Sequence, residues 1–539
     1  SGRIRNLPLS LCVGRNEERN GQDTNEFIID ALVDNVGVFA SAVLPSDGFH
    51  PADAALWLDF EEEIAEGSYY SYGIGARTYG SIWPDRVPQP EMWQMKKSQQ
   101  PLNYRMLDSR TGLVEIRNRS YFANASVYAT RWEVTADGET VASGTLDLDI
   151  EPQGSVAVHV PYTRPEIVPG KEYRLTLSSC LRKDEIWAPA GHEVAWEQFE
   201  LDGWNLPAAP APKPAGHVDL TQSEGKLIAS GAGFTYAFDA RSGALSSMLV
   251  DGKEMLSSPL KVNLWRAPVA NEIDGWNAGT VRSLLNNSQQ GYGTIGASST
   301  IAAIYYAAGL DNLNWIPVSV KSRTEDGAVY IDVRELVLFG GAQGITQLDL
   351  YIMGRRAIGM ESLFSWRVDA DGTVTVKHRL FPEGDMPAWL PRVGVTLSLD
   401  GTLDHVQWYG RGPQASYPDR KSGYRMGEWS TTVDEMYEPY LIPQDYGLRM
   451  DCRRVCFTDG SGKGLMFRMD EPFGFNAYPF TTDNLTKAVY QYQLERSGDI
   501  TVNLNYADTG VGDTARGTLP GYRAYPQTYE RTIVISPVR

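Results

Sequence analysis

The run Trp408-Tyr409-Gly410-Arg411-Gly412-Pro413, followed closely by Tyr417-Pro418-Asp419-Arg420, is the stretch that decides the fold. Its glycines and prolines are typical of tight turns at the ends of strands. Its arginines and its aspartate can form charge-assisted hydrogen bonds that pin loops between sheets. We therefore predict a structural, loop-pinning role for four residues of this region: Arg411, Asp419, Arg420 and Arg449.

Apolar and polar residues alternate on both sides of this stretch, and this period predicts β-strands. Val393, Val395 and Leu397 alternate with polar or small residues upstream of it. The same pattern in residues 99–205 predicts an immunoglobulin-like sandwich. A proline-rich linker at 206–217 separates that sandwich from residues 218–539, where continued alternation predicts one large sandwich.

Four further runs accompany the first two: Trp265-Arg266-Ala267-Pro268, Pro391-Arg392-Val393-Gly394, Pro439-Tyr440-Leu441-Ile442-Pro443-Gln444 and Gly447-Leu448-Arg449. Taken together, and in the order in which they follow one another along the chain, the runs resemble the small-chain domain of family 2 glycoside hydrolases of the β-galactosidase type. The resemblance implies a galactose-mutarotase-like supersandwich for residues 218–539. It also implies an enzyme that hydrolyses terminal non-reducing β-D-galactosides with retention, so a β-galactoside or oligosaccharide is the expected partner.

Residues 1–98 resemble the end of that family's catalytic TIM barrel. The stretch Tyr79-Gly80-Ser81-Ile82-Trp83-Pro84-Asp85-Arg86 is similar to the segment that leads out of the barrel. A short helix is expected from Pro90, because proline suits the first turn of a helix. The expected fold class is therefore mainly β, with an incomplete α/β barrel before the two sandwiches. Such a chain would be a C-terminal portion, inactive alone, with a complementary barrel-containing chain as a further expected partner.

The segment Arg5-Asn6-Leu7-Pro8-Leu9-Ser10, followed by Gly14-Arg15-Asn16-Glu17, resembles the family's barrel strand that ends in Asn-Glu. The resemblance implies that Glu17 is the general acid/base and that Asn16 holds the sugar's 2-hydroxyl. That contact strengthens as the oxocarbenium-like transition state forms. Trp57 resembles the tryptophan that walls the galactose site, and a core aromatic on a barrel strand is the alternative.

The second carboxylate of a retaining glycosidase, the nucleophile, is not found in the sequence. It should lie about 5–5.5 Å from the acid/base. In the family it is a glutamate between the Asn-Glu and the tryptophan, but residues 37–55 contain no glutamate, only Asp47 and Asp53. Asp59 is the other aspartate that such a role would have to use. The family's magnesium and sodium ligands are not recognisable either, so no metal site and no cofactor is assigned.

The formal net charge of −18 argues against nucleic acid and anionic membranes as partners. A neutral sugar is compatible with this charge. The four cysteines show no zinc-binding spacing. The sequence leaves open the linkage preference, the oligomeric state, a homo-oligomer included, and the bacterial compartment, whether cytoplasmic or periplasmic.

Two other functions compete with the hydrolase. The chain could be a non-catalytic carbohydrate-binding or scaffold module of a split or truncated enzyme. It could also be a mutarotase-like epimerase, which needs a paired glutamate and histidine in the cleft of the sandwich. His378 and His405 are the only histidines of residues 218–539, and their strand-like surroundings favour buried core histidines instead.

Overall fold

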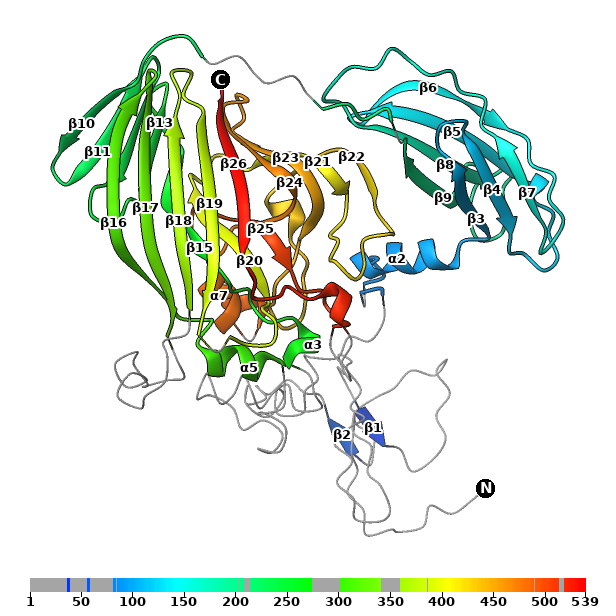
Figure 1. Ribbon diagram of the computed structural model, residues 1–539. Coiled ribbons are helices and arrows are strands. Elements are labelled where there is room, and N and C mark those ends of the chain that lie inside the picture. Colours follow the sequence, from blue (N-terminus) through cyan, green and yellow to red (C-terminus); the bar gives the residue numbers. More distant parts are fainter. Residues whose placement is uncertain are drawn as a thin grey trace.

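The computed structural model is mainly β, with two sandwiches of unequal size (Figure 1). It describes residues 36–38, 56–58, 81–83, 85–201, 203–207, 214–273, 301–340, 359–384, 386–488, 490–512 and 518–539. Within these residues no helix has the length and apolar character needed to cross a membrane.

The smaller sandwich has seven strands in two sheets. One sheet has the order β3-β4-β7 and the other β6-β5-β8-β9, an arrangement that confirms the predicted immunoglobulin-like fold. The elements are η4 (Ala125–Val127), β3 (Leu102–Asp108), β4 (Leu113–Asn118), β5 (Tyr128–Ala136), β6 (Glu139–Leu146), β7 (Ser155–His159), β8 (Tyr173–Leu181) and β9 (Glu193–Glu200).

Alternating side chains of the two sheets form the core of this sandwich. Leu175 and Leu177 of β8 are fully buried and pack with Trp132 of β5. Asn118, at the end of β4, is buried as well, and its amide donates to the carbonyl oxygens of Ala123 and Ile150 at 2.8 and 2.9 Å. This side chain therefore ties a loop to the edge of the sandwich, since a buried amide without partners would be costly.

The larger sandwich combines a five-stranded meander with a curled twelve-stranded sheet. The meander contains β10 (Asp219–Ser223), β11 (Lys226–Gly231), β12 (Phe234–Asp239), β13 (Leu245–Val250) and β14 (Lys253–Glu254). The large sheet contains β15 (Leu256–Asn263), β16 (Leu313–Glu325), β17 (Ala328–Phe339), β18 (Gly359–Val368), β19 (Val374–Glu383), β20 (Arg392–Leu399), β21 (His405–Gly412), β22 (Arg425–Thr432), β23 (Arg449–Thr458), β24 (Gly464–Tyr478), β25 (Ile500–Asp508) and β26 (Tyr529–Val538).

The path of the large sheet explains its curl. Its main order is β15-β20-β25-β24-β26-β19-β18-β17-β16, and β23, β21 and β22 branch from β24. The first part of β24 pairs with β26, whereas its last residues pair with β25. One long strand thus joins both halves of the sheet around a core that includes Trp366 and Trp408, as predicted for the supersandwich.

Short helices gather at one end of the larger sandwich (Figure 1). They are α3 (Ala270–Ile273), α5 (Ile301–Ala308) and α7 (Thr482–Lys487), with η6 (Asp434–Met436), η7 (Gln491–Gln493) and η8 (Pro520–Tyr522). The helix α2 (Pro90–Gln99) begins at proline, as predicted, and leads from this region to β3 of the smaller sandwich.

Direct polar contacts join the two sandwiches. In the described part of the chain β22 pairs with β21 on one side. Beyond its other edge lies Gln198 of β9, whose amide accepts from the backbone N–H of Met426 at 2.9 Å and donates to the Met426 carbonyl at 3.0 Å. Ion pairs Arg425–Glu193, at 2.5 Å, and Arg453–Glu172 lie beside it. A side chain therefore covers backbone groups that an edge strand would otherwise expose.

The first part of the chain is described only in small pieces. The strands β1 (Val36–Val38) and β2 (Leu56–Leu58) pair antiparallel, whereas neighbouring strands of a TIM barrel run parallel. The rest of residues 1–80 lies outside the described residues. The barrel remnant at 1–98 and the domain boundaries at 99–205, 206–217 and 218–539 therefore stay predictions.

The two histidines of the larger sandwich differ in their surroundings. His378 on β19 is buried, its ring nitrogens lie 3.1 Å from the Ser362 hydroxyl and 2.7 Å from the Tyr506 hydroxyl, and burial lowers its pKa to about 3. The expectation of a core histidine is correct here. It is wrong for His405, which is exposed beside Asp404, because its strand neighbours Val406 and Trp408 take the inward positions.

We expect Gln198→Ala to lower the melting temperature by a few degrees, because the N–H and C=O groups of Met426 lose partners worth about 1 kcal/mol each. Differential scanning fluorimetry measures this. Gln222→Ala, at an exposed position of β10, is the matched control and should melt like the parent. Equal melting temperatures for Gln198→Ala and the parent would show that the side chain does not hold β22.

Candidate functional site

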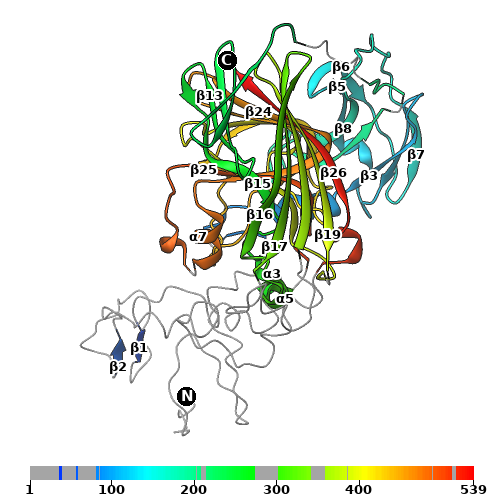
Figure 2. The ribbon, with the colours of Figure 1, turned by 60° about the vertical axis from the view of Figure 1, so that its left-hand side comes forward.

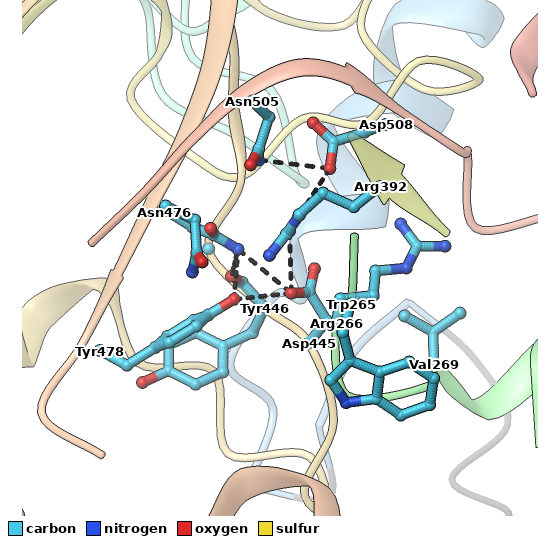
Figure 3. Close-up of polar contacts among 12 residues, drawn as sticks. Trp265, Arg266, Val269, Arg392, Asp445, Tyr446, Asn476, Tyr478, Asn505 and Asp508 are labelled. Carbon is cyan, nitrogen blue, oxygen red and sulfur yellow. Dashed lines mark hydrogen bonds and ion pairs between the residues drawn. The ribbon is translucent and has the colours of Figure 1, made fainter. Parts of the chain in front are cut away.

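A buried ion-pair network lies where the recognised sequence runs converge, at the helix-covered end of the larger sandwich. Its centre is Arg392, the first residue of β20 (Figure 3). The guanidinium donates through Nε to Asp508 Oδ1 and through Nη2 to Asp445 Oδ1, both at 3.0 Å. The three side chains are at most 1% exposed. One cation thus bridges two carboxylates in a place without solvent.

Besides Arg392, Asp445 accepts hydrogen bonds from two other parts of the chain. Its Oδ2 accepts from the Tyr417 hydroxyl at 2.7 Å. Its Oδ1 accepts from the Tyr478 hydroxyl at 2.6 Å and from the Asn476 amide at 3.2 Å (Figure 3). The loop at 413–420, the loop before β23 and the end of β24 therefore meet at one carboxylate.

A second buried arginine ties the Trp-Arg-Ala-Pro run to the loop after β25. Arg266 pairs with Glu272 of α3 at 2.8 Å, and it donates to the carbonyl oxygens of Thr509 and Gly510 at 2.6 and 3.2 Å. The other oxygen of Glu272 accepts from the Val269 N–H at 3.0 Å. The guanidinium thus satisfies carbonyl groups of a loop that has no sheet partner at this point.

The four residues predicted to pin loops all contact loop backbone. Arg411 donates to the carbonyls of Lys421 and Tyr424 at 3.1 and 2.9 Å, and it pairs with Asp451 at 2.6 Å. Asp419 accepts from the N–H groups of Val511 and Gly512 at 3.1 and 2.7 Å.

The other two of these residues are buried. Arg420 donates to the Ala415 carbonyl at 3.1 Å, and Arg449 donates to the Gly447 carbonyl at 2.8 Å. The guanidinium of Arg449 also lies 5.3 Å from the centre of the Trp408 ring. The structural role of all four residues stays a prediction, and these contacts support it.

The same end of the sandwich holds the segment that comes from the N-terminal part of the chain. The Tyr424 hydroxyl donates to the Pro90 carbonyl at 2.5 Å, and Arg420 pairs with Glu91 of α2 at 3.3 Å. Trp83 packs edge-on against Tyr440, with ring centres 5.3 Å apart. The loops that the network orders therefore contact and hold Trp83, Pro90 and Glu91.

The residues predicted to perform hydrolysis lie, in whole or by their side chains, outside the part of the chain that the structure describes. Asn16 and Glu17 lie outside the described residues, as do Asp47, Asp53 and Asp59. Trp57 lies in β2, opposite Gly37 of β1, and its side chain is outside the described part. Their catalytic and binding roles stay predictions.

No group of three or more His, Cys, Asp and Glu side chains that could hold a metal ion occurs among the described residues.

Arg266 and Arg392 belong to the quoted runs, whose arginines are expected to pin loops, but they are not among the four residues singled out. Asp445 and Asp508 were missed. Asp445 directly follows the quoted run that ends at Gln444, and Asp508 ends the alternating segment of β25. For Asp508, the available signal was an acidic residue at the end of an alternating strand.

We expect Arg392→Met to destabilise the chain by about 3–5 kcal/mol, because it leaves two buried carboxylates without their cation. The control is Arg379→Met, which removes an exposed pair with Glu530 at 2.6 Å and should cost at most about 1 kcal/mol. Urea unfolding followed by tryptophan fluorescence compares the two. Similar losses in both variants would contradict a special role for Arg392.

The carboxyl of Glu438, in the loop before β23, should make the stability of the chain depend on pH. Burial raises its pKa to about 7, against the opposing effect of Arg449, from an ordinary value of 4.5. Between these two values the folded chain holds a proton that the unfolded chain releases, so this carboxyl makes folding less favourable as pH rises. The melting temperature of Glu438→Gln relative to the parent should therefore rise from about pH 5 to about pH 8.

The control for this experiment is Glu435→Gln in the neighbouring turn. Hydrogen bonds from Thr431 and Thr432 hold the pKa of Glu435 below its ordinary value, so the carboxyl stays ionised over the same range. Its melting temperature relative to the parent should not change with pH. An unchanging difference for Glu438→Gln would refute the raised pKa.

Comparisons with known proteins cover both sandwiches. Residues 230–535 match the family model described as beta galactosidase small chain, and residues 114–202 match the model described as beta-galactosidase, domain 4. A β-galactosidase of Priestia megaterium (strain DSM 319 / IMG 1521) is 28% identical over 490 residues, which are 89% of this chain and 42% of the relative. A β-galactosidase of Vibrio cholerae serotype O1 is 28% identical over 473 residues, 85% of this chain and 41% of the relative.

The chain thus spans about two fifths of the length of these curated relatives. A solved galactose 1-epimerase from Lactobacillus acidophilus NCFM aligns with 60% of this chain and 99% of its own, at 10% identity and a TM-score of 0.30, which is too low to bear on function. The first family model, by contrast, covers more than half of the chain. This chain belongs to the β-galactosidase small-chain family.

Proposed function

We propose that this chain is the C-terminal portion of a retaining β-galactosidase that hydrolyses terminal non-reducing β-D-galactosides. The observation that carries the proposal is the match to relatives named β-galactosidase over 85–89% of the chain. The contacts that hold Trp83, Pro90 and Glu91 on the larger sandwich support it, because the segment that leads out of a barrel must be fixed for the barrel's groups to reach their positions.

In this proposal Glu17 is the general acid/base, Asn16 holds the 2-hydroxyl and Trp57 walls the sugar. Retaining hydrolysis needs a nucleophilic carboxylate about 5–5.5 Å from the acid/base. Residues 37–55 offer only Asp47 and Asp53. The proposal therefore includes a complementary barrel-containing chain that supplies the nucleophile and the remaining barrel strands.

A second candidate is a non-catalytic scaffold or carbohydrate-binding module of a split or truncated enzyme. The structure favours it in one respect, because the buried network and the interface between the sandwiches form within this chain. Both candidates predict little or no hydrolysis by the chain alone, so they differ only when a barrel-containing chain is added.

We expect the purified chain to release no product from a chromogenic β-galactoside at an enzyme-like rate, since removing one member of a jointly acting pair costs nearly as much as removing both. Co-expression with a barrel-containing chain encoded beside it should give turnover in the ordinary range of about 1–1000 s⁻¹. Glu17→Gln in the same complex is the control and should abolish that turnover.

Turnover by the chain alone that disappears in Glu17→Gln would refute the need for a partner. Activity of the complex that survives Glu17→Gln would refute the assignment of the acid/base. A stable complex without any turnover would favour the scaffold.

A further inference from the structure

A pocket of about 370 Å³ opens beside the large sheet, in the angle between β15, β16, β20 and the helices α5 and α7. Figure 2 shows these two helices next to the ends of β15 and β16. The volume lies within the range of small-molecule sites, about 300–1,000 Å³. It is separate from the Arg392 network, whose charged residues do not line it.

Aromatic rings form part of its lining. Trp265 is buried and lies with its ring centre 5.0 Å from that of Tyr306. The indole N–H of Trp265 donates to the Thr486 hydroxyl at 3.1 Å, and that of Trp315 donates to the Val262 carbonyl at 3.0 Å. The Lys261 Nζ lies 4.1 Å from the centre of the Trp315 ring and covers part of it. Because both N–H groups are already bound, what the indoles offer to a ligand is the remaining apolar ring surface that lines the pocket, in a fixed orientation.

The polar part of the lining is rich in hydroxyl groups and carries no net charge. Seven serine and threonine residues line the pocket, together with Asn263. Its charged residues are two lysines and two aspartates, namely Lys261, Lys487, Asp311 and Asp483. Lys487 and Asp483 pair with each other at 2.9 Å.

This chemistry selects one class of ligand. An anion such as a phosphate would need an excess of positive charge, and the formal charges here cancel. Some of the polar groups are already bonded within the chain, such as the Asn263 amide to Asn503 at 3.0 Å and the Thr396 hydroxyl to the Val502 carbonyl at 3.1 Å. A purely apolar ligand would still remove water from the charged residues and the remaining hydroxyls of the lining, which is unfavourable. A neutral molecule with apolar faces and many hydroxyl groups satisfies both the rings and the polar lining, and these are the properties of a sugar.

We propose that this pocket binds a neutral mono- or disaccharide. The binding needs no catalytic carboxylate pair, so it goes beyond the proposed hydrolysis and belongs to the chain alone. Trp315 supplies apolar contact, and Asp483 at the rim accepts hydrogen bonds from sugar hydroxyls.

Titration calorimetry of the full chain with D-galactose and with lactose tests the proposal, with inorganic phosphate as the comparison ligand. We expect saturable binding of at least one sugar and none of phosphate. Trp315→Leu should weaken sugar binding about tenfold or more, because it removes a large apolar contact. The control Trp187→Leu changes an exposed tryptophan of the smaller sandwich and should bind like the parent.

Asp483→Ala is a second variant, at an exposed position where folding should be unaffected, and it should also weaken binding. Absence of saturable binding for both sugars would overturn the proposal. So would sugar binding that neither Trp315→Leu nor Asp483→Ala weakens, because the sugar would then lie elsewhere on the chain. Neither result depends on hydrolysis, so these experiments test sugar binding separately from the proposed function.

Discussion

The bridge from Arg392 to Asp445 and Asp508 is the interaction on which the end of the larger sandwich depends. Charges without solvent are unfavourable unless ion pairs and hydrogen bonds satisfy them together. Asp445 meets this requirement by accepting hydrogen bonds from Tyr417, Tyr478 and Asn476. The network can therefore exist only when five separate parts of the chain reach their places, which makes it a constraint on the fold as well as a set of contacts.

The consequence of this constraint is seen at the surface of the same loops. The turn at 413–420 that supplies Tyr417 also supplies Arg420, which pairs with Glu91 of α2. The loop that supplies Asp445 also carries Tyr440, which packs on Trp83. Ordering the interior of these loops therefore fixes where the segment from the N-terminal part arrives. In the proposed enzyme, the sandwich would contribute to a rigid active site by holding this segment in place.

The sequence predicts the strands but not which distant residues contact each other in the fold, and the reason is physical. Alternation along β20 and proline at the start of α2 are local signals, so both elements follow from neighbouring residues. The partners of Arg392 lie 53 and 116 positions away. The register of β20 with β25 brings Asp508 to it, whereas the path of the loop before β23 brings Asp445. His405 shows the same limit, because its exposure depends on which face of β21 is packed. The predicted catalytic residues Asn16 and Glu17 lie outside the described residues, so their sequence assignment stays untested.

Hydrogen–deuterium exchange of the full chain, with and without Arg392→Met, tests the central role of the network most directly. The account predicts that the variant loses amide protection in the loops at 413–420, 437–447 and 508–512 and in residues 83–91. It also predicts that the distant meander β10–β13 keeps its protection. Unchanged protection in those loops, or an equal loss throughout both sandwiches, would contradict the claim that this ion-pair network orders the end of the sandwich.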